Sequence, residues 1–201
     1  RFLSFRSRMA RLSWRRTPAG RADILAFFPC EKKFGAQLPA ASSFAKLARM
    51  SLESVRAFLA EHAPDIAVIV TEQSSATVDL AAAAHGVEPA QIAKTICLRA
   101  GDTAMLVVAK GTARLDNRKF KDAFAAKPRM LGADEVVALT GHPVGGVCPF
   151  GLATPLPVWC DVSLRAFDEV VPAAGATNAA LRIAPGRLAE LTGAAWIDVC
   201  Q

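Results

Sequence analysis

Hydrophobic and polar positions from residue 51 onward alternate between a helical period and strand-like runs. Apolar residues within 52–59 recur at helical spacing after Ser51, a residue type that caps helices well, and Pro64 ends the pattern. The run IAVIV at 66–70 has the composition of a buried strand. The elements expected in this part are a helix over 51–63, a strand over 66–70, an alanine-rich helix over 75–85 stopped by Gly86, and a hairpin of strands 94–99 and 103–109.

The rest of the chain continues this alternation. Asp116 can cap a short helix over 117–124, and Pro185 takes the favoured first position of a helix over 185–192. The remaining expected elements are a helix over 133–140 and strands over 156–162, 169–171, 180–183 and 196–199. Helices and strands interspersed in this way, without internal repeats, predict an α/β (α+β) fold: a single domain with a mixed, barrel-like β-sheet and flanking helices.

Charge separates the first quarter of the chain from the rest. Residues 1–50 carry a net charge of +9, which leaves −3 for residues 51–201 of a chain whose total is +6. The first quarter also shows no sustained helical or alternating period. We therefore expect residues 1–49 to be a basic extension, either a start placed too early or a disordered arm, with a targeting peptide as a third interpretation. Residues 50–201, from Met50 onward, are expected to form the domain.

The five cysteines and three histidines show no C-x-x-C pair and no metal-ligand spacing, so no metal or other cofactor is expected. An odd number of scattered cysteines is typical of reduced thiols in a cytoplasmic protein rather than of a disulfide framework. No apolar run approaches the roughly 20 residues that a membrane span needs, so no membrane partner is expected.

The segment TGHPVGGVCPFG, residues 140–151, contains four glycines and two prolines, which specify a shaped loop. The N–H groups of Gly145, Gly146, Val147 and Cys148 can form a concave nest for a carbonyl oxygen, a carboxylate or a phosphate. The alternative is a tight structural turn between a helix and a strand.

Lys94 begins the apolar strand KTICLR, where a charged side chain is unusual. A lysine at a strand end commonly extends its ammonium to water. If the side chain instead points into a pocket, it supplies a fixed positive charge for an oxyanion or a phosphate, or a base with a lowered pKa. The residues alone leave both interpretations open.

Cys148 lies six residues after His142 and suggests a thiol nucleophile paired with an imidazole. Such a pair needs hydrogen-bond distance and a third group that orients the base. The alternative for Cys148 is a small side chain that fills space beside the loop. His142 can contact substrate or order a water, or it can be a structural histidine.

Basic residues are concentrated between Lys110 and Arg129, where seven of the thirteen Lys and Arg of 51–201 fall. With two aspartates, this segment carries +5 and leaves −8 for the rest of the domain. A charged helix surface is common, but this segregation favours a face that meets nucleic-acid phosphates. The candidate tRNA-binding residues are Arg114, Arg118, Lys119 and Lys121.

Four segments in this order, QIAKTICLR, ARLDNRKFKDAF, TGHPVGGVCPFG and LPVWCDVSL, closely resemble the YbaK/ProX-type aminoacyl-tRNA deacylases, over about residues 51–200. The resemblance implies homology to the editing insertion of bacterial prolyl-tRNA synthetases, which hydrolyses the ester of a mischarged tRNA. It therefore implies a hydrolase whose partners are mischarged aminoacyl-tRNA and an aminoacyl-tRNA synthetase. The implied catalysis uses neither a metal nor a protein nucleophile.

The resemblance also assigns residues to roles. Lys94 falls on the functional lysine of the family and is expected to supply charge and position as the catalytic residue. The glycine loop is expected to cradle the substrate, and His142 or the ribose hydroxyl of the terminal adenosine to order the attacking water. The expected substrate-binding residues of this loop are Gly141, His142, Gly145, Gly146, Val147, Cys148, Pro149 and Gly151.

The segment 173–178 departs from the cysteine-specific deacylases, whose equivalent segment is richer in Gly, Lys and Arg, so a cysteine substrate is not assigned. Thr177 and Asn178 are expected to bind substrate, because a hydroxyl and an amide can recognise a polar side chain such as serine or threonine; alternatively they end a strand. Two rival functions remain. One is a tRNA- or nucleotide-binding module of the same fold without turnover, and the other is a thiol hydrolase that uses Cys148 and His142.

Overall fold

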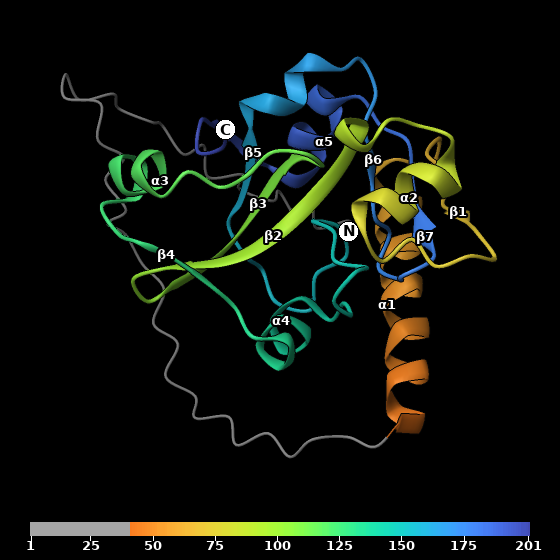
Figure 1. Cartoon of the computed structure of the whole chain (residues 1–201). Coiled ribbons are helices and arrows are strands. Elements are labelled where there is room, and N and C mark those ends of the chain that lie inside the picture. Colours follow the sequence, from red (N-terminus) through yellow and green to blue (C-terminus); the bar gives the residue numbers. More distant parts are fainter. Residues whose placement is uncertain (1–40) are drawn as a thin grey trace, which may run out of the picture. The chain divides into compact units, whose positions relative to one another are not determined.

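The predicted hairpin forms the centre of the main sheet in a computed structural model that describes residues 41–201, with side chains from residue 51 onward (Figure 1). Strands β2 (Ile92–Ala100) and β3 (Thr103–Lys110) pair antiparallel from Ala93 opposite Lys110 to Ala100 opposite Thr103. The connection needs only Gly101 and Asp102, because Gly101 adopts a φ of 57° that a tight hairpin turn requires. The expected hairpin is confirmed.

Short strands extend this hairpin on both sides. The main sheet has the order β4-β2-β3-β5-β8, and β6 pairs with the start of β2. β4 is antiparallel to β2, whereas β5, β6 and β8 are parallel to their partners, so the predicted mixed sheet is confirmed. The bounds of the other strands are β1 Ile69–Val70, β4 Pro128–Met130, β5 Val158–Asp161, β6 Val171–Pro172, β7 Ala179–Ala180 and β8 Ala195–Ile197.

Five α-helices of residues 41–201 flank the strands, and their ends follow the expected capping chemistry. Thr77 and Asp116 accept N–H groups of the first turns of α2 and α3, while Gly86 and Gly193 end α2 and α5 in the left-handed conformation. None of the helices described is both long and apolar enough to span a bilayer. The helices are α1 Ala41–His62, α2 Val78–His85, α3 Asn117–Phe124, α4 Ala133–Thr140 and α5 Pro185–Thr192.

Two expectations from the sequence are wrong. The first helix begins at Ala41 rather than at Ser51, because no glycine or proline of 41–50 interrupts it, and the Ser51 hydroxyl donates to the Gly175 carbonyl instead of capping. Only Ile69–Val70 of the expected buried strand 66–70 pairs, in a two-stranded sheet with β7, and both residues are exposed whereas their β7 partners are buried. Residues 1–40, most of the expected extension, lie outside the described part of the chain.

The two faces of the sheet pack against different elements. One face contributes Cys97, Leu106 and Val108 to the larger core, which also contains residues of α1, α4 and α5. The opposite face carries a second core with residues of α3. That core contains Leu98, Met105, Val107, Ala109, Phe120 and Phe124.

Strand pairing assigns the two central polar residues of β2 to opposite faces. Lys94 is opposite Ala109 and therefore belongs to the face that packs on α3, while Thr95 is opposite Val108 and belongs to the face of the larger core. This alternation directs the side chain of Thr95, and not that of Lys94, to the face of the larger core.

Candidate functional site

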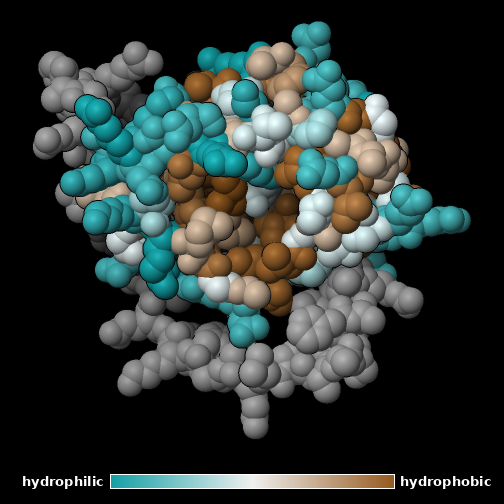
Figure 2. Space-filling view, in the orientation of Figure 1, coloured by the Kyte–Doolittle hydropathy of each residue, from teal (hydrophilic) through white to brown (hydrophobic). Residues whose placement is uncertain are grey.

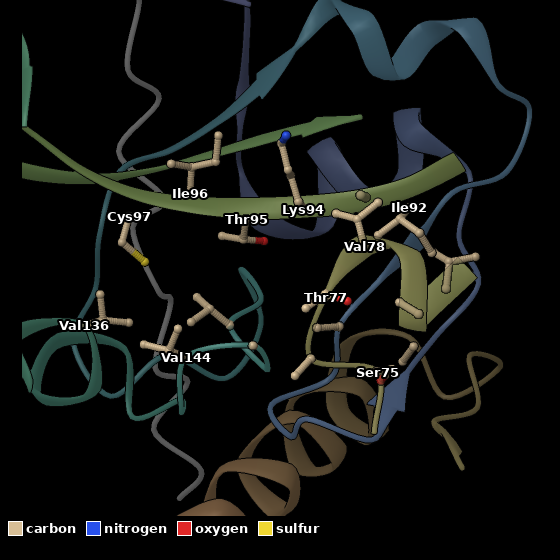
Figure 3. Close-up of a pocket in the computed structure, with 18 of the residues that line it drawn as sticks. Ser75, Thr77, Val78, Ile92, Lys94, Thr95, Ile96, Cys97, Val136 and Val144 are labelled. Atoms are coloured by element: carbon tan, nitrogen blue, oxygen red, sulfur yellow. The ribbon is translucent and has the colours of Figure 1, made fainter. Parts of the chain in front are cut away.

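A cavity of about 300 Å³ lies where the sheet is interrupted beside β2. β6 pairs with β2 only at Ile92 and Ala93, and β4 pairs with it only at 98–100, so no strand of residues 41–201 covers the edge between them. The cavity is visible in Figure 2 as a hollow of hydrophobic residues, and Figure 3 shows its walls. The lining residues are 75–78, 81, 92–97, 130–131, 136, 144–145, 147, 171, 173 and 179–180.

The glycine loop forms one wall of this cavity and adjoins the segment before α2. Gly145 has a φ of 89°, and a Cβ there would lie 2.9 Å from the Ala76 Cβ. Glycine at 145 therefore lets the loop approach the segment that leads into α2. At the mouth of the cavity, Met130 and Val144 leave 62% and 59% of their surfaces exposed.

Hydrogen bonds inside the loop reduce the number of N–H groups that the predicted nest offers to a ligand. The N–H of Gly146 donates to the Pro143 carbonyl (2.9 Å), and the N–H of Cys148 donates to Nδ1 of His142 (3.3 Å). The N–H groups of Gly145 and Val147 have no partner among the described residues, and both residues line the cavity. Two of the four expected donors thus remain available to a ligand.

The other loop residues of the predicted set lie behind the cavity wall. His142, Cys148 and Pro149 are buried, and Gly141 ends α4. Gly146 and Gly151 allow close packing, since a Cβ would lie 2.6 Å from the backbone of Ala176 and 2.7 Å from the backbone of Ser54, respectively. In the observed arrangement these six residues shape the loop without bordering the cavity.

Thr177 and Asn178 form hydrogen bonds with the segment before α2, which lines another side of the cavity. The Thr177 carbonyl accepts the N–H of Ser75 (2.6 Å), and the Asn178 carbonyl accepts the N–H of Thr71 (2.8 Å). The Asn178 amide nitrogen also donates to the Thr71 carbonyl (3.0 Å). Neither residue borders the cavity, so they hold the segment before α2 in place, and their expected contact with substrate stays a prediction.

Lys94 borders the cavity with its strand but directs its ammonium to the opposite face of the sheet. In Figure 3, Lys94 and Ile96 point away from the cavity, and Thr95 and Cys97 point toward it. The ammonium donates to the carbonyls of Gly111 (2.8 Å) and Ala113. Burial lowers the pKa of Lys94 below its usual value. The expected catalytic role of this residue stays a prediction.

Burial makes Cys148 a poor nucleophile. Its Sγ lies 3.7 Å from Nδ1 of His142, but the side chain is fully buried outside the cavity, and burial raises the pKa of the thiol to about 12. Burial also lowers the pKa of His142 to about 4, so the imidazole is neutral and its Nδ1 accepts the Cys148 N–H. A thiolate–imidazolium pair would need the opposite shifts.

The buried His142 predicts that stability falls in mild acid. His142 binds a proton near pH 6.5 in the unfolded chain and only near pH 4 in the folded chain. Its contribution to the free energy of unfolding is therefore fully present above pH 6.5 and is lost as the pH falls toward 4. The titration of this histidine alone lowers the free energy of unfolding by about 3 kcal/mol across that pH interval. His142→Asn keeps an acceptor for the Cys148 N–H without the titration, so denaturant unfolding between pH 7 and pH 4.5 should show a shallower decline. Equal pH dependence in both proteins would contradict the assignment.

The basic segment 110–129 lies largely on and around α3. Arg114, Arg118 and Lys121 are exposed and form no ion pair within the described residues. Lys119 is half-buried and forms an ion pair with Asp198 (2.7 Å). Three of the four predicted tRNA-binding side chains are therefore free, and Figure 2 shows hydrophilic residues over the region of α3 beside the hydrophobic hollow.

Several cavity residues were not expected from the sequence. Residues 75–77 were expected to be the start of the helix over 75–85, but α2 begins at Val78 with Thr77 as its cap, and Thr95 reads as one polar position in an apolar strand. The Ser75 hydroxyl donates to the Thr177 carbonyl (3.1 Å) and the Thr77 hydroxyl accepts the Leu80 N–H (3.3 Å), whereas Thr95 Oγ1 is buried without a hydrogen-bond partner in the described part of the chain. The sequence contained one signal for these cavity residues, which was Thr95 itself. It is a polar residue at a strand position where an apolar core residue would be expected.

Comparisons with known proteins identify the family of the chain. The aminoacyl-tRNA editing domain family matches residues 72–191. YwhH, an uncharacterized protein of Bacillus subtilis (strain 168), is 46% identical over 154 residues, which are 76% of this chain and 98% of that protein. A proline–tRNA ligase of Solidesulfovibrio magneticus is 36% identical over 107 residues, which are 52% of this chain and only 18% of the ligase.

A solved structure described as a candidate trans-editing enzyme for prolyl-tRNA synthetase has a TM-score of 0.70 at 34% identity, over 75% of this chain and 97% of that one. The resemblance predicted from the four sequence segments is confirmed. Because the family match covers more than half of the chain and contains every residue that lines the cavity, the chain belongs to the aminoacyl-tRNA editing domain family.

Proposed function

We propose that this chain hydrolyses, in trans, the ester bond that joins a wrong amino acid to tRNA. The observation that carries the proposal is the cavity itself. It is small and mostly apolar, as a pocket for an aminoacyl group should be, and free N–H groups of Gly145 and Val147 border it. The similarity to part of proline–tRNA ligases makes mischarged tRNA for proline the first substrate class to consider.

The reaction needs a water that attacks the ester carbonyl carbon and a bond that breaks between this carbon and the ribose oxygen. Negative charge develops on the carbonyl oxygen, which the free N–H groups of Gly145 and Val147 can stabilise. One such donor is worth roughly 3–4 kcal/mol in hydrolases. The ribose oxygen leaves with a proton, and the products are the free amino acid and the uncharged tRNA.

We propose that Lys94 is required for this reaction. In the observed rotamer it acts as a positioning residue, because its ammonium binds the two carbonyls that follow β3 and fixes the turn beside the start of β2. Gly111 in that turn leaves room for Val78, a cavity residue, since a Cβ at 111 would lie 2.7 Å from Val78 Cγ1. Direct contact with the ester requires the ammonium to leave these carbonyls.

The exposed basic side chains near α3 are assigned to the tRNA phosphates. Reversal of Arg114, Arg118 and Lys121 to Glu should weaken tRNA binding by at least about tenfold at 0.15 M salt and reduce the salt slope by about 2, because fewer counterions are released. Turnover of a minimal aminoacyl-adenosine ester should persist. Arg56→Glu, an exposed arginine on α1, is the matched control. Equal losses on tRNA and on the minimal ester would make the segment structural.

Deacylation of mischarged tRNA by the full chain tests the proposed function. The panel is tRNA for proline carrying alanine, serine, threonine or cysteine, and the measured quantity is the amino acid released per unit time over the uncatalysed rate. We expect acceleration for at least one member of the panel. Tight binding of tRNA without acceleration of any ester would identify a binding module of the same fold instead.

A further inference from the structure

The main chain of Thr95 is directed toward the cavity rather than toward β3. On β3, the N–H of Leu106 donates to the Pro157 carbonyl (2.9 Å), so alternate residues of β3 from Leu106 face β5, and Val108, opposite Thr95, is one of them. On β2, the Cys97 carbonyl accepts the N–H of Leu131 (3.1 Å), which lies on the side away from β3. Thr95 is two residues from Cys97 and therefore presents its N–H and C=O to that same side.

Within the part of the chain that the structure describes, no strand pairs with this side of β2 at Thr95. The pairing with β6 ends at Ala93, and the pairing with β4 begins at Leu98. The described chain after β6 pairs with the β7 segment, since the N–H of Ala174 donates to the Ala179 carbonyl, and it forms no hydrogen bond with Thr95. The buried Oγ1 of Thr95 also lacks a partner among the described residues. Thr95 thus combines an open donor, an open acceptor and an unpaired hydroxyl at the cavity wall, although buried polar groups are normally paired.

An aminoacyl group has the chemistry that fills this gap. In a hydrogen-bonded pair of an antiparallel sheet, two residues exchange both of their N–H···O=C bonds. The amino acid of an aminoacyl ester carries a donor, its α-ammonium, and an acceptor, its ester carbonyl, on the same residue. It can therefore replace the missing ladder residue opposite Thr95.

We propose that the main chain of Thr95 anchors the aminoacyl residue, its carbonyl accepting the α-ammonium and its N–H donating to the ester carbonyl. This inference rests on the proposed function and adds the group that orients the substrate in it. Directly opposed residues of an antiparallel pair direct their side chains to the same face. The substrate side chain then points, with that of Thr95, into the apolar cavity (Figure 3).

Two stable analogues test this anchor on the full-length protein: 3′-deoxy-3′-(alanylamino)adenosine and its propionylamino counterpart, which lacks only the α-ammonium. Alanine is small enough for the cavity, and the amide resists hydrolysis. We expect the alanyl analogue to bind at least about tenfold more tightly, because a charge-assisted hydrogen bond is lost in its counterpart. Equal dissociation constants, in protein that hydrolyses mischarged tRNA, would overturn the inference and leave the proposed function intact.

A backbone substitution assigns the effect to Thr95. Replacement of Thr95 by its α-hydroxy acid converts the N–H into an ester oxygen, and this N–H takes no part in the pairing with β3. Both analogues keep their carbonyl, so both should bind about tenfold more weakly to this variant. The ratio of their two dissociation constants should stay the same. Unchanged binding of both analogues would contradict the anchor. If the variant does not fold, the comparison of the two analogues on the unaltered protein still tests whether the α-ammonium is bound. Protein that accelerates no ester would instead refute the proposed function, whatever the analogues show.

Discussion

Gly146→Ala should strongly impair both folding and hydrolysis. A Cβ at this position would lie 2.6 Å from the carbonyl carbon, 2.8 Å from the Cα and 2.9 Å from the nitrogen of Ala176. All three are backbone atoms, so neither side can yield by rotating a side chain. Such overpacking costs about 3 kcal/mol, which for a domain of this size lowers the melting temperature by roughly 6–12 °C.

Loss of activity should accompany this loss of stability, because the neighbours of Gly146 in the chain line the cavity. Displacing the loop moves the free N–H groups of Gly145 and Val147, and a shift of about 1 Å at a catalytic site can cost roughly a hundredfold in rate. Deacylation is measured well below the melting temperature, so that unfolding does not enter the rate.

Gly186→Ala is the matched control for this substitution. Gly186 lies in the first turn of α5, and a Cβ there meets no atom within 4 Å. Alanine in a helix is favourable relative to glycine by about 0.8–1.0 kcal/mol, so this variant should be as stable as the parent or slightly more stable. Wild-type melting and turnover in Gly146→Ala would show that the loop and the 174–177 segment do not pack as observed.

Local chemistry made much of the fold predictable. Asp116, Gly86 and Pro185 mark helix ends by capping and by fixed backbone angles, effects that depend only on neighbours in the chain, and each marks the predicted end. The hairpin around Gly101 is local in the same sense. By contrast, Ser51 has the chemistry of a cap but lies inside a helix, because the preceding residues continue it and Gly175 offers its hydroxyl a distant acceptor.

The position of the cavity could not be predicted in the same way. The alternation in KTICLR separates Lys94 from Thr95, but it does not say which face borders a cavity. That depends on where β4 and β6 stop pairing with β2, and both strands lie at least 28 residues further along the chain. The sequence correctly indicated that the glycine loop has a special backbone shape. Gly146 and Gly151, however, are required by close contacts with other backbone segments and not by the approach of a ligand.

Lys94→Ala should lower turnover of mischarged tRNA by at least about a hundredfold, which is roughly 2.7 kcal/mol of transition-state stabilisation. Two carbonyls, of Gly111 and Ala113, lose the ammonium that fixes them, so the turn beside the start of β2 is no longer held. Folding should persist, because the side chain is only half-buried and contributes no apolar packing to either core. Single-turnover assays at saturating enzyme separate this loss from weakened tRNA binding.

Two further substitutions at this position separate charge from geometry. Lys94→Met keeps the aliphatic stem without the ammonium and should be as inactive as alanine. Lys94→Arg keeps the charge, but the planar guanidinium cannot take the place of a compact ammonium between the two carbonyls, so it should also be impaired. A minimal aminoacyl-adenosine ester then distinguishes the roles: a loss as large as that on tRNA places the effect of Lys94 at the ester, and a much smaller loss places it at the tRNA. Wild-type turnover of Lys94→Ala on both substrates would remove Lys94 from the mechanism, and the open edge of β2 and the loop N–H groups would remain as proposed contributors.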